Sequence, residues 1–71
     1  MDYDRALMLL DALHAASSLE PLKVLRAVRL HALVGDRKGC WAMTVNGRWR
    51  ITFRFGDGDA HDVAIEDYHR G

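Results

Sequence analysis

The last residues of the chain concentrate groups that can transfer protons. Glu66, Asp67, Tyr68 and His69 follow one another and supply two carboxylates, a phenol and an imidazole. An imidazole can act as acid or base near neutral pH, and a neighbouring carboxylate can orient it. On composition alone such a tail is more often solvated than catalytic, so its chemistry depends on what the fold places beside it.

Two residues from the middle of the chain are candidates to meet the tail. In residues 27–33, Val28 and Leu30 alternate with Arg29 and His31, so His31 and Arg29 should project from the non-core side of a strand. Arg50 lies in a second alternating stretch. If His31, Arg50 and the tail share a face, the set suits phosphodiester cleavage. A base takes the ribose 2′-hydroxyl proton, an acid protonates the leaving oxygen, and arginine stabilises the charged phosphorane. The sequence alone leaves this convergence open.

The stretch from residue 41 to residue 55 is the element around which the rest must be organised. Its apolar residues recur with a period of two on either side of Asn46-Gly47, which predicts an antiparallel hairpin. They are Trp41, Met43, Val45, Trp49, Ile51, Phe53 and Phe55. A two-residue turn would pair Val45 with Arg48, against the apolar pattern. We therefore expect an odd-numbered loop or a bulge. A three-residue loop gives the pairs Val45 with Trp49, Met43 with Ile51, and Trp41 with Phe53.

The same alternation places Arg50, Thr52 and Arg54 together on the opposite face of the hairpin. Such a face needs either solvent or an anion, and the pattern by itself favours a solvated polar face.

The flanking elements complete a small α+β fold. Apolar residues at intervals of three and four predict a helix over residues 3–16, and Pro21 can open a short helical turn. Gly35 to Gly39 predict a connecting loop, and the glycine and aspartate residues at 56–59 predict a last tight turn. A final strand follows, with Val63 and Ile65 expected to face inward. We predict one domain, residues 1–71, with the helix packed on a three- to four-stranded antiparallel sheet.

Composition excludes several classes of protein. Cys40 is the only cysteine, which rules out an internal disulfide framework and a cysteine zinc site. No apolar run approaches membrane-spanning length, and the first residues lack the basic start of a signal peptide. No histidine or carboxylate spacing indicates a metal site. We expect a soluble, cytoplasmic protein without a bound metal.

The charges are unevenly distributed although they cancel overall. Residues 26–54 carry seven lysines and arginines against Asp36 alone, whereas residues 55–71 are acidic. A basic centre flanked by acid is consistent with internal pairing or with a surface that binds a polyanion, and charge alone does not decide between them.

The motifs of the second half resemble, in order and spacing, those of the HigB toxins. The stretches are RLHALVGDRKG at residues 29–39, Trp41, NGRWRITFRF at 46–55, DGDA at 57–60 and EDYH at 66–69. HigB toxins belong to the RelE-like ribonuclease superfamily of type II toxin–antitoxin systems. The resemblance covers roughly residues 6–69 and is strongest over residues 29–69.

The resemblance implies a fold of two helices on an antiparallel sheet and ribosome-dependent cleavage of messenger RNA. It also implies a HigA-type helix-turn-helix antitoxin as partner and no cofactor. Residue by residue, the catalytic set would be His31, Arg50, Asp67, Tyr68 and His69. We expect Asp67 or His69 to transfer protons, Arg50 and His31 to contact phosphate, and Tyr68 to orient or stack the nucleotide. The cations expected to bind RNA are Arg29, Arg37, Lys38, Arg48 and Arg54.

Two departures from the family pattern leave alternatives open. Val34 stands where the family usually has a lysine, and the match begins at the family's second helix, without its first strand and helix. An uncovered sheet edge would follow, and with it a homodimer through that edge. We therefore weigh three hypotheses: an endoribonuclease toxin, a truncated and catalytically inactive relative that binds antitoxin or ribosome, and an unrelated small RNA- or protein-binding module.

Overall fold

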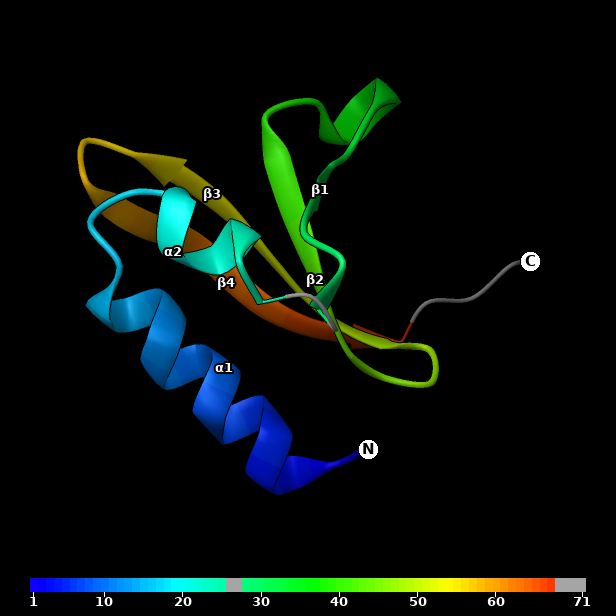
Figure 1. The fold of residues 1–71 in the computed structure, drawn as a ribbon. Coiled ribbons are helices and arrows are strands. Elements are labelled where there is room, and N and C mark those ends of the chain that lie inside the picture. Colours follow the sequence, from blue (N-terminus) through cyan, green and yellow to red (C-terminus); the bar gives the residue numbers. More distant parts are fainter. Residues whose placement is uncertain (26–27, 68–71) are drawn as a thin grey trace.

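The described residues, 1–25 and 28–67 of a computed structural model, form two layers (Figure 1). Helices α1 (Tyr3–Ala15) and α2 (Glu20–Lys23) lie on one face of an antiparallel sheet. Its strands are β1 (His31–Ala32), β2 (Cys40–Asn46), β3 (Trp49–Gly56) and β4 (Asp59–Asp67), and they lie side by side in that order. A short 3-10 turn, η2 (Gly35–Arg37), connects β1 to β2. The predicted α+β architecture is confirmed.

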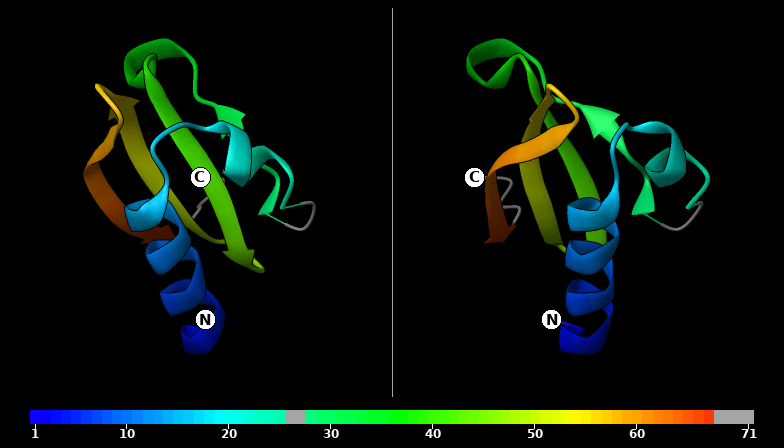
Figure 2. Two further views of the ribbon diagram at one scale, coloured as in Figure 1. Left: turned by 60° about the vertical axis from the view of Figure 1, so that its left-hand side comes forward. Right: turned by 90° about the vertical axis from the view of Figure 1, so that its left-hand side faces the viewer.

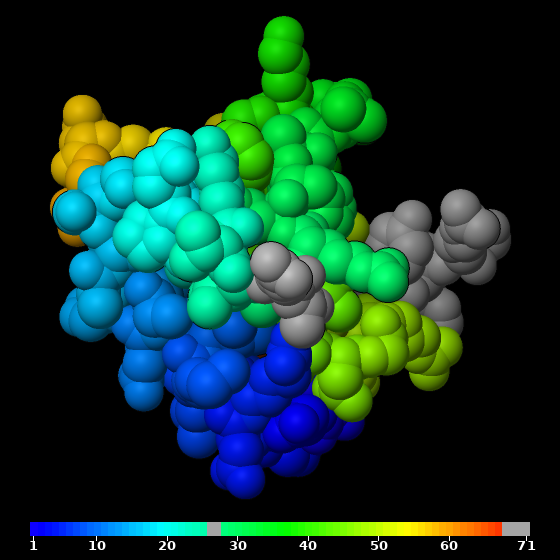
Figure 3. Space-filling model, in the orientation of Figure 1, coloured from blue at the N-terminus to red at the C-terminus, as the bar shows by residue number. Residues whose placement is uncertain are grey.

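Helix α1 begins and packs as its sequence predicts. The Asp2 side chain accepts a hydrogen bond from the backbone N–H of Arg5 at 3.0 Å and thereby caps the first turn. The backbone N–H of Asp2 donates to Asn46 Oδ1 at 2.8 Å, which ties the start of the helix to the hairpin turn. Leu9 and Leu13 are buried against the sheet. In the space-filling view, the two helical segments cover most of this side of the sheet (Figure 3).

The hairpin of β2 and β3 has most of the predicted register. Trp41 lies opposite Phe53 and Met43 opposite Ile51, as expected. The predicted pair of Val45 with Trp49 is wrong, because Asn46 lies opposite Trp49 and the register shifts between Thr44 and Asn46. The expected bulge therefore lies in β2, where it keeps Val45 buried at 2% exposure while Gly47, at a φ of +55°, turns the chain.

One apolar core lies between the helices and the sheet. Its buried members are Ala6, Leu9, Leu13, Ala16, Leu22, Val28, Met43, Val45, Ile51 and Phe53. Trp41, Trp49 and Phe55 pack against it and remain partly exposed. The core residues of the hairpin alternate along the strands with polar residues, so the sheet presents one apolar face and one polar face, as predicted.

The strand predicted over residues 27–33 is much shorter than expected. Only His31 and Ala32 form β1; Val28 is buried beside a helical turn, and its backbone N–H bonds to the Leu25 carbonyl at 3.1 Å. Arg29 has a φ of +50°, a left-handed conformation that cannot continue a strand. Residues 26 and 27 lie outside the described part of the chain.

Strand β4 follows the predicted tight turn and forms one edge of the sheet (Figure 2). Asp57 and Gly58 turn the chain with φ values of +54° and +78°. Ile65 lies opposite Ile51 on the helix side of the sheet, so it faces inward as predicted, yet Val63 and Ile65 are still 44% and 40% exposed. An edge strand has a neighbour on one side only, and the described helices leave this part of its apolar face uncovered.

None of the helices formed by the described residues is long and apolar enough to cross a membrane.

Candidate active site

A pocket of about 380 Å³ opens beside the turn of the β2–β3 hairpin. Four of its lining side chains are among the predicted catalytic and RNA-binding residues: Arg29, His31, Arg48 and Arg50. Leu33, Thr44, Gly47 and Trp49 complete the lining. The fold therefore brings together two predicted catalytic residues and two predicted phosphate contacts from β1, β3 and the segments next to them.

His31 is held in one orientation by the backbone. Its Nδ1 lies 2.8 Å from the carbonyl oxygen of Arg29. A carbonyl only accepts hydrogen bonds, so Nδ1 carries the hydrogen, and in the neutral ring Nε2 is then the nitrogen that can accept a proton. The left-handed backbone of Arg29 turns that carbonyl toward the ring two residues later. His31 is solvent-exposed and can thus present Nε2 to a ligand.

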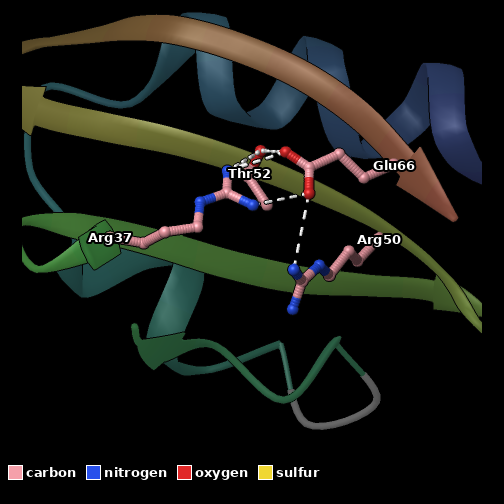
Figure 4. Close-up of polar contacts among 4 residues, drawn as sticks. All are labelled: Arg37, Arg50, Thr52 and Glu66. Atoms are coloured by element: carbon pink, nitrogen blue, oxygen red, sulfur yellow. Dashed lines mark hydrogen bonds and ion pairs between the residues drawn. The ribbon is translucent and has the colours of Figure 1, made fainter. Parts of the chain in front are cut away.

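Arg50 belongs to a cluster of charged and polar side chains on the polar face of the sheet. Figure 4 shows Arg37, Arg50 and Thr52 pointing toward the carboxylate of Glu66. The Glu66 Oε1 accepts hydrogen bonds from Arg37 Nη1 at 2.7 Å and from Arg50 Nη2 at 3.4 Å. Its Oε2 accepts from Arg37 Nη2 at 2.7 Å and from Thr52 Oγ1 at 2.8 Å. Residues of η2, β3 and β4 therefore meet at one carboxylate.

These contacts fix the charge of Glu66. Its pKa is lowered from 4.5 to about 2, mainly by the hydrogen bonds from Arg37; burial opposes this effect, and the hydrogen bonds from Thr52 and Arg50 add to it. The same hydrogen bonds to Glu66 raise the pKa of Arg37. Glu66 stays ionised near neutral pH, so its role in the cluster is that of a fixed negative charge and not of a proton donor.

The last residue of β4, Asp67, lies next to the pocket. Asp67 lies opposite Trp49 in the sheet, and its Oδ1 is 3.2 Å from Arg48 Nε. Trp49 and Arg48 both line the pocket. Asp67, the first residue of the predicted catalytic trio, is thus next to the site, whereas Tyr68 and His69 lie outside the described residues.

The predicted RNA-binding cations fall into two groups. Arg37, Arg48 and Arg54 each pair with a carboxylate of β4, Arg54 with Asp62 at 3.7 Å. Arg29 and Lys38 form no ion pair within the described part of the chain. The basic centre and acidic end noticed in the sequence are therefore neutralised in part by internal pairing across β3 and β4.

Sequence reasoning named Glu66 among the titratable groups of the tail but did not assign it to the site. Register could have indicated it, because Glu66 lies directly opposite Arg50 once the last hairpin is formed. The prediction of a solvated polar face is wrong at its centre, where Thr52 is 1% exposed and the Arg50 side chain 18%. It holds at Arg54, whose side chain is 49% exposed.

Val34, which stands where the HigB pattern has a lysine, is 85% exposed and does not line the pocket. Within residues 1–25 and 28–67, no group of three histidine, cysteine or carboxylate side chains is placed to hold a metal ion.

Comparison with known proteins places the chain in a family. The model of the HigB-like toxins, described as the RelE-like toxin of type II toxin–antitoxin system HigB, matches residues 2–69. The chain belongs to this family. A curated HigB relative, named Endoribonuclease HigB, from Proteus vulgaris, is 44% identical over 68 residues, which is 96% of this chain and 73% of the relative.

Membership of the HigB-like family confirms the resemblance seen in the sequence motifs. It makes the protein a type II toxin, and such a toxin has an antitoxin as its partner. The third hypothesis, an unrelated RNA- or protein-binding module, is excluded.

Proposed function

We propose that this HigB-like toxin is a ribosome-dependent endoribonuclease that cleaves messenger RNA through attack of the ribose 2′-hydroxyl on the adjacent phosphodiester. The observation that supports the proposal is the shared pocket of His31 and Arg50, beside which Asp67 lies opposite Trp49. The curated relative, named as an endoribonuclease, supports the same reaction class.

The pocket offers the groups that this reaction requires. A general base removes the 2′-hydroxyl proton, the 2′-oxygen bonds to phosphorus, and the bond from phosphorus to the 5′-oxygen breaks as a general acid protonates that oxygen. The products are a 2′,3′-cyclic phosphate and a 5′-hydroxyl. Nε2 of His31 can accept a proton or donate a hydrogen bond to phosphate, and Asp67 and His69 are the other candidates for proton transfer.

Arg50 is the residue we expect to stabilise the transition state. Its side chain is 18% exposed and lines the pocket, so a guanidinium charge acts there with little screening by water. Arg29 and Arg48, in the same lining, can bind the flanking phosphates. Tyr68 would orient or stack the nucleotide, as the family resemblance implies.

A HigA-type helix-turn-helix antitoxin is the partner we propose, and the ribosome with its bound messenger is the substrate complex. Acting on translated messenger places the toxin in the cytoplasm. The reaction as proposed needs no cofactor.

Primer extension on a messenger that is being translated tests the proposal. Purified toxin is added to a ribosome-containing translation mixture, with Arg50→Ala, His31→Ala and His69→Gln as variants and Lys23→Ala as control. Lys23 pairs with Glu20 at 3.1 Å on α2 and is not part of the pocket. We expect cleavage within codons by the wild type and the control, and its loss in the three variants.

Ribosome binding without cleavage by the folded wild-type chain would contradict the proposal. That outcome would instead identify a catalytically inactive relative, the reading that Val34 favours. Binding to the ribosome should also weaken steeply with added salt, because each phosphate that an arginine neutralises releases counterions.

A further inference from the structure

Glu66 and Arg37 have a defined place beside the pocket but no role in the reaction as proposed. We propose that Glu66 is a positioning residue that orients Arg50 toward the phosphate, and that Arg37 neutralises Glu66 so that the charge of Arg50 stays available. The inference rests on the proposed function in treating the pocket as the phosphate site.

The geometry separates the two arginines into an inner and an outer one. Arg50 lines the pocket and touches Glu66, whereas neither Glu66 nor Arg37 is part of the lining. The order of contact is therefore Arg37, then Glu66, then Arg50, then the ligand. A residue two contacts away from the ligand acts through its neighbours, which is why we assign Arg37 here to positioning and not to RNA binding.

The hydrogen-bond distances show which partners hold the Glu66 carboxylate most closely. Arg37 meets Glu66 with two hydrogen bonds of 2.7 Å, the bidentate arrangement that gives the strongest guanidinium–carboxylate contact. Arg50 Nη2 contacts the same carboxylate at the longer distance of 3.4 Å. Thr52 holds the second carboxylate oxygen at 2.8 Å and prevents the group from rotating. Glu66 is thus engaged mainly by Arg37 and restrains Arg50 by its weaker contact.

The charges of the three groups explain why Arg37 is needed. A carboxylate alone beside Arg50 would form a bidentate pair with it and cancel the positive charge that a phosphate requires. With Arg37 present, the three ionised groups carry a net charge of plus one, and the pKa of Glu66, lowered mainly by Arg37, keeps this balance at neutral pH. Arg37 lies on η2, which carries its side chain over the polar face from outside the sheet.

A double-mutant cycle on the ribosome-bound reaction tests the inference. The single-turnover cleavage rate is measured for Arg37→Ala, Glu66→Gln and the double variant, with Lys23→Ala, Glu20→Gln and their double variant as a matched ion pair away from the pocket. Misplacing a catalytic group costs up to about a hundredfold in rate, so we expect Arg37→Ala to approach that loss and Glu66→Gln to lose about tenfold.

The decisive result is the cleavage rate of the double variant. Glu66 is the carboxylate that the described residues show in contact with Arg50, so Arg37→Ala combined with Glu66→Gln should recover to the rate of Glu66→Gln alone. If Arg37 instead bound RNA directly or only held the fold together, the double variant would be as slow as Arg37→Ala or slower, and the inference would be overturned. Arg37→Lys, which keeps the charge, should stay closer to the wild type than Arg37→Ala and serves if the alanine variant does not fold.

A measurement without RNA separates this inference from the proposed function. The Nε–Hε NMR signal of Arg50 should shift in Arg37→Ala and return toward its wild-type position in the double variant. If the wild type cleaves no messenger, the proposed function fails while this signal still decides whether Glu66 captures Arg50. An unchanged Arg50 signal in Arg37→Ala would overturn the inference whatever the cleavage assay shows.

Discussion

The two faces of β4 differ in how the rest of the chain meets them. On the polar face, Glu66 is held by three residues from η2 and β3 through hydrogen bonds of 2.7 to 3.4 Å. On the helix face, Val63 and Ile65 are 44% and 40% exposed, although they share a face with the buried Ile51. One strand thus presents a fully engaged carboxylate on one side and incompletely covered apolar residues on the other.

The difference shows that the site is built from directional contacts more than from core packing. The side chains that set the charge at Arg50 lie outside the apolar core, so substitutions there should change activity more than stability. None of the fully buried core residues lies on β4, so stability should depend mainly on the central strands β2 and β3. Substitutions on the two faces of the sheet test this division.

Ile51→Ala should be the most destabilising of these changes. Ile51 is 0% exposed at the centre of β3, and replacing a fully buried isoleucine by alanine costs about 2 to 5 kcal/mol. A domain of this size has little stability to spare, so we expect the variant to be largely unfolded at 37 °C. Thermal unfolding followed by circular dichroism measures it. A loss no larger than that of a surface substitution would show that the core does not lie where the structure places it.

Acid should destabilise the polar face through Glu66. The pKa of Glu66 is about 2 in the folded chain, against an ordinary value of 4.5 that applies to the unfolded chain. Protons therefore bind more tightly to the unfolded chain. The stabilisation is present in full above pH 4.5 and is lost as the pH falls toward 2. We expect the melting temperature of the wild type to fall over this range more than that of Glu66→Gln. Parallel curves for the two proteins would contradict the ion pair with Arg37.

The hairpin and α1 could be predicted from the sequence because their signals are local. Period-two alternation on both sides of Asn46-Gly47 was enough to predict either an odd-numbered loop or a bulge, and the pairs of Trp41 with Phe53 and Met43 with Ile51. The strand expected around His31 failed for an equally local reason, the left-handed conformation of Arg29, which no alternation of side chains reveals. His31 nevertheless reached the pocket with Arg50.

The cluster at Glu66 and the exposure of Val63 depend on contacts between distant parts of the chain. Arg37 reaches Glu66 across 29 residues of sequence, from a loop whose composition predicted only a connection. Likewise, the alternation in β4 says which side chains share a face, but burial requires another element to cover that face. Sequence patterns thus predicted the orientation of side chains and could not predict their partners.

Thr52→Val should have an intermediate effect on stability. Thr52 is 1% exposed, and its hydroxyl donates to Glu66 Oε2 at 2.8 Å, so valine keeps the shape and removes one bond to an ionised group. The expected cost is about 1 to 2 kcal/mol in urea unfolding. Thr44→Val is the matched control on the neighbouring strand, since the Thr44 hydroxyl forms no hydrogen bond within the described residues. Equal costs for the two substitutions would show that the bond to Glu66 adds nothing.

Ile65→Ala should have the smallest effect, although Ile65 faces Ile51 across the sheet. Because the side chain is already 40% exposed, its removal gives up less buried area and leaves no closed cavity, and we expect a cost below about 1 kcal/mol. Urea unfolding at two protein concentrations measures it. A cost close to that of Ile51→Ala, together with stability that rises with protein concentration, would mean that a second copy covers this face. A small, concentration-independent cost would instead show that the apolar face of β4 stays open in the free toxin, while Glu66 on its other face remains fully engaged.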